Sequence, residues 1–366
     1  MSTTFSSLPI VDLSPLQTKS SLGAQSLHDL SHRLYHVFAT TGFAYLVNSP
    51  LSFTPDEVFS MAREFFSLPT ETKMSIAKRS FNKDNSNTYR GYFPTQPDVA
   101  TDNLKEGLEI GPPHLLNVVP GPDVKINLAE PNIWPDAGSF TGRSSLEQLY
   151  SELQSLSSRL LSLLAVSLGK SEDYFTDYLV ASLSTLRLLH YPIPPSVNDD
   201  DGDGTQPETH STVADPQKEP NQSSKLDSVL GCSSQSISDV KLSCTPHTDS
   251  GILTLLHQDS TGGLEVRDSS GRWVPAPYIP DSIVVNIGDL MAKVSGGRFV
   301  ATMHRVRRPE ATSKNEGGGI GRFSVPFFFE PGEKCIVRDV DGKEDAVVYG
   351  DHVREKMKTW VEFKGL

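Results

Sequence analysis

From residue 245 to residue 256 the chain reads Thr-Pro-His-Thr-Asp-Ser-Gly-Ile-Leu-Thr-Leu-Leu, a histidine and an aspartate two positions apart before an apolar run. Side chains alternate between the faces of a strand, so His247 and Asp249 can point to the same side. The run 251–256 is apolar and partly β-branched, which is typical of a buried strand. We therefore expect a pair of metal-binding groups carried by one strand.

A second histidine completes a possible set of ligands. His304 stands in the stretch Ala-Thr-Met-His-Arg-Val, 55 positions after Asp249. The interval holds about four segments of strand length, enough for the chain to leave a barrel and return to its opposite wall. Two imidazoles and one carboxylate form a facial set for divalent iron and leave further positions on the metal open.

The third element is the stretch 321–330, which reads Gly-Arg-Phe-Ser-Val-Pro-Phe-Phe-Phe-Glu. Arg322 and Ser324 again lie two apart, so both can face one side of a strand. A guanidinium fork pairs bidentately with a carboxylate, and a serine hydroxyl adds a donor. Each motif alone is common by chance and is more often structural. Their order and their strand-like settings together indicate a site that binds an oxo-diacid on iron.

With these motifs in this order, the chain resembles the iron(II)- and 2-oxoglutarate-dependent oxygenases of the isopenicillin N synthase-like group. The likeness extends over nearly the whole chain. The stretch Leu-Pro-Ile-Val-Asp-Leu-Ser at 8–14 resembles the opening strand of the family's N-terminal region. Further segments that follow in the order of the family are 42–48, 62–69, 88–92, 104–111 and 131–135.

The resemblance implies a role for each motif. His247, Asp249 and His304 match the iron ligands of the family. Arg322 and Ser324 match the pair that binds the distal carboxylate of 2-oxoglutarate.

A tyrosine adds to the cosubstrate site. Tyr191, in Leu-Arg-Leu-Leu-His-Tyr-Pro at 186–192, matches a tyrosine that many members place near the same carboxylate. Many relatives have an asparagine two positions before it, whereas this chain has Leu189. That departure removes a polar contact to the cosubstrate.

The implied chemistry uses iron(II), 2-oxoglutarate and O2. Oxidative decarboxylation to succinate and CO2 would drive oxidation, in the first place hydroxylation, of a C–H bond in a small organic molecule of secondary metabolism. Metal and cosubstrate carry the hard chemistry, so we expect no catalytic side chain beyond the metal ligands. Desaturation and cyclisation remain open as variants.

Two other functions remain open. A 2-oxoglutarate-independent iron oxidase or cyclase of the same fold also carries Arg-x-Ser, and Leu189 favours that alternative. A non-catalytic binding protein on the same scaffold is the other, against which the intact triad argues.

Composition sets further limits. The formal net charge of −12 argues against nucleic acid and anionic membranes as partners, and no apolar stretch is long enough to span a bilayer. The three cysteines are sparse and odd in number, which indicates reduced thiols. Cys244 lies near His247, but a soft thiolate suits this site poorly. The N-terminus shows no secretory pattern. We expect a cytoplasmic monomer that acts on a small molecule.

The segment 196–243 differs from the rest of the chain. It holds nine acidic residues, three lysines and no aromatic residue. Such a stretch cannot bury enough apolar area to offset the entropy of ordering it. We predict a disordered insertion, either a passive surface loop or a lid.

The predicted fold class is α+β, with a double-stranded β-helix (jelly-roll) core and flanking helices. Leucines at helical spacing predict a helix at 144–168, and further helices are expected at 26–40 and 55–67. The apolar stretch 282–287 reads as a buried strand, and Asn286 as the start of the turn after it.

Three regions are expected. An N-terminal dioxygenase region covers 1–135, the oxygenase core covers 144–330, and a tail at 331–366 with a short helix to residue 361 packs near the active site. Because N-terminal loops and tail commonly shape the substrate pocket in this family, the predicted substrate contacts are Tyr89, Tyr92, Phe93 and Phe327.

Overall fold

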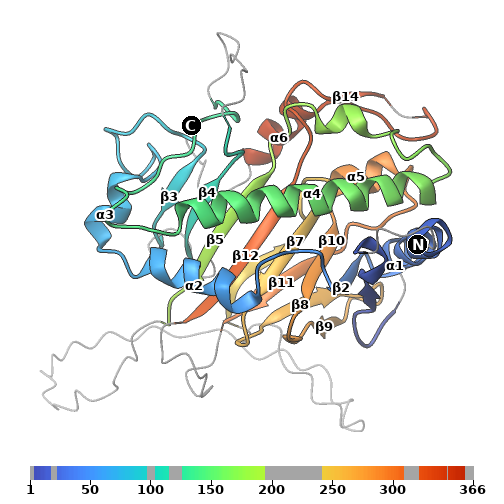
Figure 1. Cartoon of the computed structure of the whole chain (residues 1–366), viewed down its shortest axis with the longest axis horizontal. Coiled ribbons are helices and arrows are strands. Elements are labelled where there is room, and N and C mark those ends of the chain that lie inside the picture. Colours follow the sequence, from blue (N-terminus) through green and yellow to red (C-terminus); the bar gives the residue numbers. More distant parts are fainter. Residues whose placement is uncertain are drawn as a thin grey trace, which may run out of the picture. The chain divides into compact units, whose positions relative to one another are not determined.

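The computed structural model describes residues 4–17, 23–96, 104–114, 126–193, 241–308, 321–343 and 345–358 (Figure 1). Most of the predicted insertion 196–243 lies outside these residues. Its last two positions, Leu242 and Ser243, begin a strand instead, so the prediction set that boundary too late in the chain.

Two facing sheets form the centre of the described chain. The larger sheet has the strand order β1 (Ile10–Asp12), β2 (Phe43–Val47), β10 (Ile283–Ile287), β7 (Leu253–Gln258), β12 (Arg322–Phe329), β5 (Thr185–Tyr191), β4 (Glu106–Ile110) and β3 (Gly91–Phe93). The smaller sheet has the order β6 (Leu242–His247), β11 (His304–Arg307), β8 (Leu264–Arg267) and β9 (Trp273–Pro275). This is the predicted jelly-roll core.

Side chains from the two sheets meet in one hydrophobic cluster. Phe43 and Val284 come from the larger sheet, and Val266 and Val306 come from the smaller one. The face of the larger sheet that meets the smaller sheet is called the inner face below. On the other face, helix α4 (Arg143–Ser167) lies across the strands (Figure 1).

The helices follow from local sequence. The helices are α1 (Gly23–Thr40), α2 (Pro55–Phe66), α3 (Thr70–Ser75), α4, α5 (Asp289–Val294) and α6 (Tyr349–Met357), with 3-10 turns η1 (Ser14–Leu16) and η2 (Thr176–Leu179). At the start of α2, the Thr54 hydroxyl accepts the Glu57 N–H at 3.3 Å, and the Glu57 carboxylate accepts the Thr54 N–H at 2.8 Å. Such a capping box stabilises a helix by about 1 kcal/mol.

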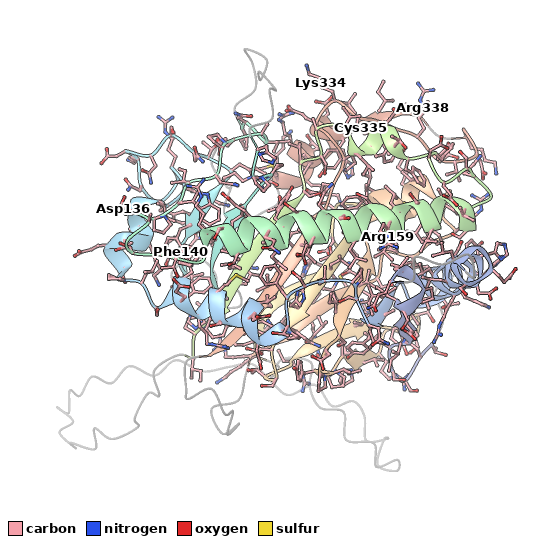
Figure 2. All side chains as sticks on the ribbon, in the orientation of Figure 1. Asp136, Phe140, Arg159, Lys334, Cys335 and Arg338 are labelled. Carbon is pink, nitrogen blue, oxygen red and sulfur yellow. The ribbon has the colours of Figure 1, made fainter. Side chains whose placement is uncertain are left out.

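The leucines of α4 make it the main cover of the sheet. Their side chains are buried at the spacing the sequence predicted, for example Leu146, Leu149, Leu153, Leu156, Leu160 and Leu164. Arg159, labelled in Figure 2, donates a 2.6 Å hydrogen bond to the Leu16 carbonyl and so ties α4 to η1.

The path of the chain corrects one expectation about His304. The chain crosses from β6 to the larger sheet at β7, returns at β8 and β9, crosses again at β10, and comes back at β11. The four intervening strands are present, but β11 lies beside β6, and His304 pairs directly with His247. The expectation of opposite walls was wrong, because the last return to the smaller sheet inserts β11 between β6 and β8, so both histidines lie on neighbouring strands of one sheet.

The C-terminal region contacts the chain near the predicted triad. Strands β13 (Ile336–Val337) and β14 (Val347–Val348) pair, and α6 follows. Lys356 on α6 forms a 2.7 Å ion pair with Asp289, whose N–H donates to the Asp249 carbonyl at 2.7 Å. The predicted helix end at 361 lies beyond the described residues. No helix in the described ranges has the length and apolar character needed to cross a bilayer.

Candidate active site

The predicted triad comes together at the edge of the smaller sheet. His247 ends β6, His304 begins β11, and Asp249 lies in the loop after β6. One ligand atom from each residue lies within 4.8 Å of the others. The Nε2 atoms of His247 and His304 are 3.8 and 3.7 Å from Asp249 Oδ1. Asp249 was expected on the strand itself, but the strand ends two residues earlier.

The main chain orients both imidazoles. His247 donates its Nδ1 hydrogen to the Thr245 carbonyl at 2.8 Å, and His304 donates its Nδ1 hydrogen to the Thr302 carbonyl at 3.2 Å. These acceptors require the proton on Nδ1, which leaves each Nε2 with a lone pair toward Asp249. Cys244 contacts the Nδ1 atom of His247 at 3.8 Å, on the edge of the ring away from Asp249.

Two side chains hold the carboxylate. Asp249 Oδ2 accepts hydrogen bonds from Thr254 Oγ1 at 2.6 Å and from Asn286 Nδ2 at 2.8 Å, which leaves Oδ1 for a ligand. Burial opposes ionisation of Asp249, but His304, His247 and these two donors outweigh it and keep the pKa of its carboxyl below the ordinary value. Asn286 was expected in a turn, yet it lies within β10.

The second predicted motif lies on the inner face of β12. Arg322 is fully buried, and its Nε donates to the Gly262 carbonyl at 2.6 Å. Its guanidinium lies 4.9 Å from the ring centre of Tyr191, the residue paired with it on β5. Ser324 is buried two positions away and pairs with Leu189 on β5 and Gln258 on β7.

The arrangement around Arg322 fits a carboxylate ligand. Within the described part of the chain, its Nη1 atom is buried and has no hydrogen-bond partner. Burying a polar group without a partner costs roughly 1–3 kcal/mol, more for a charged group. A carboxylate would supply the missing acceptor, and the Ser324 hydroxyl lies on the same face. The triad offers two imidazoles and one carboxylate oxygen, a donor set that suits iron(II).

The four predicted substrate contacts do not lie together. Phe93 belongs to a small cluster with Leu189 and Tyr191, on the inner-face side. The other three, Tyr89, Tyr92 and Phe327, belong to the main core beneath the helices. Contact between Phe93 and a substrate stays a prediction, whereas the geometry directs the other three away from the triad.

Tyr92 and Phe327 make their contacts on the outer face of the larger sheet. The Tyr92 hydroxyl donates to Glu106 at 2.6 Å, and the ring of Phe327 lies 5.2 Å from that of Tyr150 on α4. Each is one residue out of phase with the inner face. Phe328, the neighbour of Phe327, lies on the inner face, and sequence alone gave no means to choose between adjacent phenylalanines.

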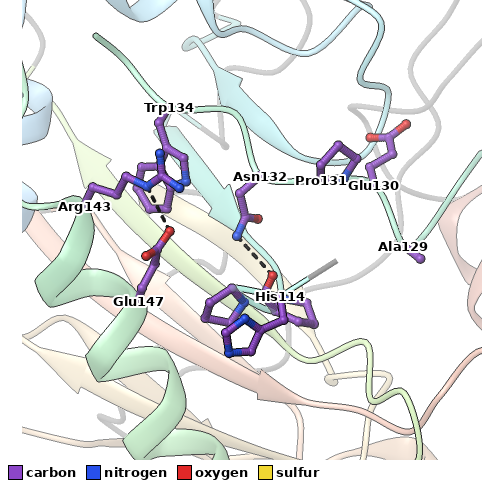
Figure 3. A pocket seen from close by; sticks show the side chains of 10 residues that line it. His114, Ala129, Glu130, Pro131, Asn132, Trp134, Arg143 and Glu147 are labelled. Carbon is purple, nitrogen blue, oxygen red and sulfur yellow. Dashed lines mark hydrogen bonds and ion pairs between the residues drawn. The ribbon is translucent and has the colours of Figure 1, made fainter. Parts of the chain in front are cut away.

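A surface pocket lies elsewhere in the molecule (Figure 3). Trp134, Arg143, Glu147 and Asn132 line it together with His114. Three of its polar side chains already bond to each other or to the backbone. Arg143 pairs with Glu147 at 2.9 Å, and Asn132 bonds to both main-chain groups of Gly111. None of the triad or Arg-x-Ser residues lines this pocket.

Two family models match the chain. The 2OG-Fe(II) oxygenase superfamily matches residues 222–331, and the N-terminal region described as "non-haem dioxygenase in morphine synthesis" matches residues 8–137.

Individual relatives agree with these matches. A 2-oxoglutarate-Fe(II) type oxidoreductase, hxnY, of Emericella nidulans is 31% identical over 286 residues, which cover 74% of this chain and 65% of the relative. Proline hydroxylase buaE of Petromyces alliaceus is 29% identical, with 89% of both chains covered. The crystal structure of a full-length Neurospora crassa protein in complex with alpha-KG and thymine aligns with a TM-score of 0.68 at 25% identity, over 96% of both chains. With both family models in chain order and the jelly-roll core in place, the chain belongs to the 2-oxoglutarate- and iron(II)-dependent oxygenases.

Proposed function

We propose that His247, Asp249 and His304 bind the iron, and that Arg322, Ser324 and Tyr191 hold the distal carboxylate of 2-oxoglutarate. The observation that carries this proposal is the set of uncommitted atoms. Both Nε2 atoms and Asp249 Oδ1 converge while every other polar atom of the three side chains is already hydrogen-bonded.

Iron(II) with 2-oxoglutarate and O2 supplies an oxidant strong enough to attack a C–H bond. The residues of the chain would bind and orient the iron and 2-oxoglutarate and exclude water from them. Main-chain carbonyls fix the two imidazoles, Thr254 and Asn286 fix the carboxylate, and Tyr191 supports the plane of the Arg322 guanidinium. No other acid or base is required within this site.

The substrate proposed is a small organic molecule, hydroxylated at a C–H bond as part of secondary metabolism. Support comes from the similar proteins. One is named a proline hydroxylase, and another was crystallised with thymine. We further propose that the protein acts in the cytoplasm as a monomer. Sparse cysteines suit a reducing compartment, and light scattering would test the assembly.

The 2-oxoglutarate-independent oxidase finds less support. Arg322 is buried with an unmet donor in a place that a diacid would fill, and the solved relative binds alpha-KG. Leu189, which favoured that alternative, packs in one apolar cluster with Tyr191 and Phe93.

An anaerobic titration tests the proposal. Metal-free protein receives Fe(II) and then 2-oxoglutarate, and the visible charge-transfer band of a keto acid bound to iron is followed. We expect a saturable band in the native protein and none in Asp249→Ala, which loses the anionic ligand. Fe(II) binding by the native protein without any band would refute the assignment of the cosubstrate site.

A further inference from the structure

The inner face of the larger sheet has an unusual pattern of exposure. Strands β5, β7 and β12 are buried along nearly their whole length, and each has one half-buried residue. These residues are Arg187, Leu256 and Phe328. All three lie on the inner face, because Leu256 and Arg187 flank Pro326 in register and Phe328 is two residues further along β12. Solvent therefore reaches these three strands at one connected place.

Leu256 lies close to the triad, whereas Arg187 lies farther from it along the sheet. Leu256 lies on β7 between Thr254, which holds Asp249, and Gln258, which pairs with Ser324. It is thus on the path from the metal ligands to Arg322, where the cosubstrate would lie. Arg187 is two strands to the side of β7, roughly 10 Å away at the usual strand spacing.

Arg187 is also separate from the cosubstrate arginine. It is level with Pro326, four residues from Arg322 along β12, which corresponds to about 13 Å at the usual rise per residue. A short diacid bound by Arg322 and extending toward Asp249 would lie along β7 and β12. It would not extend sideways to Arg187 on β5. Arg187 and Arg322 would therefore bind different ligands.

The surroundings hold the Arg187 guanidinium in a fixed orientation. It lies 5.2 Å from the ring centre of Phe328 and 5.9 Å from that of Phe93. Glu109, fully buried on β4, forms an ion pair with it and a second one with Lys78 at 2.6 Å. The Arg187 side chain nevertheless keeps 15% of its surface exposed. A guanidinium fixed in this way suits planar recognition of a carboxylate.

We propose that Arg187 binds the substrate, and that the substrate is an organic carboxylate with an apolar or aromatic body that packs on Phe328. Phe328 is one strand from Thr254, the residue that holds Asp249, so a molecule bound there lies next to the metal ligands. This inference rests on the proposed function and specifies the chemistry of its substrate.

The test uses protein loaded anaerobically with Fe(II) and saturating 2-oxoglutarate. Phenylacetate and 2-naphthoate are compared with their primary amides as probes, by calorimetry and by the change each causes in the visible band. We expect at least one acid to bind about tenfold or more tightly than its amide, because only the acid pairs with the guanidinium. Arg187→Gln should abolish that preference without changing the 2-oxoglutarate concentration that half-saturates the band. Arg187→Lys should keep part of it.

Arg63→Gln, an exposed arginine on α2, is the matched control and should behave like the native protein. The proposal is overturned if acids and amides bind equally to the native protein, if the preference survives Arg187→Gln, or if the acids bleach the band by displacing 2-oxoglutarate. In the first two of these results the band persists and the proposed function stands. Should Arg187→Gln not fold, the native comparison and Arg187→Lys decide. Absence of the band from native protein would refute the proposed function instead.

Discussion

Removing the Thr254 hydroxyl should weaken iron binding without touching a ligand. Thr254→Val keeps the shape of the side chain but deletes the 2.6 Å donor to Asp249 Oδ2. A hydrogen bond to a charged group contributes about 1.5–3 kcal/mol. Without this donor the Asp249 carboxylate is held less firmly, so Oδ1 is less well oriented toward the metal. Loss of such a supporting contact typically weakens metal binding by about 10- to 100-fold. We therefore expect the dissociation constant for Fe(II) to rise by that factor.

The assay is anaerobic competition for Fe(II) against a chromophoric chelator, together with thermal unfolding of the metal-free protein. Ser31→Ala is the control, because it also deletes a buried hydroxyl, which donates to the Leu163 carbonyl at 2.9 Å between α1 and α4. The control should lose stability but retain iron affinity. If Thr254→Val folds normally and binds Fe(II) within about twofold of the native protein, the argument that this contact orients the carboxylate fails.

Two further predictions concern buried charges. Arg322→Ala should raise the 2-oxoglutarate concentration needed for half-saturation by about 100-fold or more, since a buried charge-assisted pair is lost. Iron affinity should not change. An unchanged half-saturating concentration would show that Arg322 does not bind the distal carboxylate. Burial raises the pKa of Glu330 to about 7 from the ordinary 4.5. The folded state then keeps a proton that the unfolded state has released, so the free energy of unfolding falls as pH rises from 4.5 to 7, by up to roughly 3 kcal/mol. Glu330→Gln should reduce this fall in the free energy of unfolding. Urea unfolding at about pH 5 and about pH 8, on either side of the folded-state pKa, measures the difference, and an unchanged difference contradicts the assignment.

The sequence predicted the residues whose spacing is local. His247 with Asp249, and Arg322 with Ser324, are two apart, so one strand or strand end brings each pair together. Likewise, leucine spacing predicted α4, and the helix expected at 55–67 begins at Pro55, as α2 does.

What the sequence did not reveal depends on register between strands. Thr254, Asn286 and Arg187 lie on three different strands, and no spacing rule connects them. Their meeting depends on how β7, β10, β12 and β5 align, which is fixed by packing across the sheets. For the same reason the sequence could not show that Phe328, and not Phe327, lies on the inner face of β12.

The three proposed metal ligands differ in how they tolerate mutation nearby. The histidines take their direction from peptide carbonyls at 245 and 302, and every amino acid supplies a carbonyl. Replacing the Thr245 side chain therefore leaves the direction of His247 intact. Asp249 depends on two particular side chains from other strands. In a randomised library selected for new substrates, variants that lose iron should thus cluster at Thr254 and Asn286, while the exposed position 245 stays free to diversify.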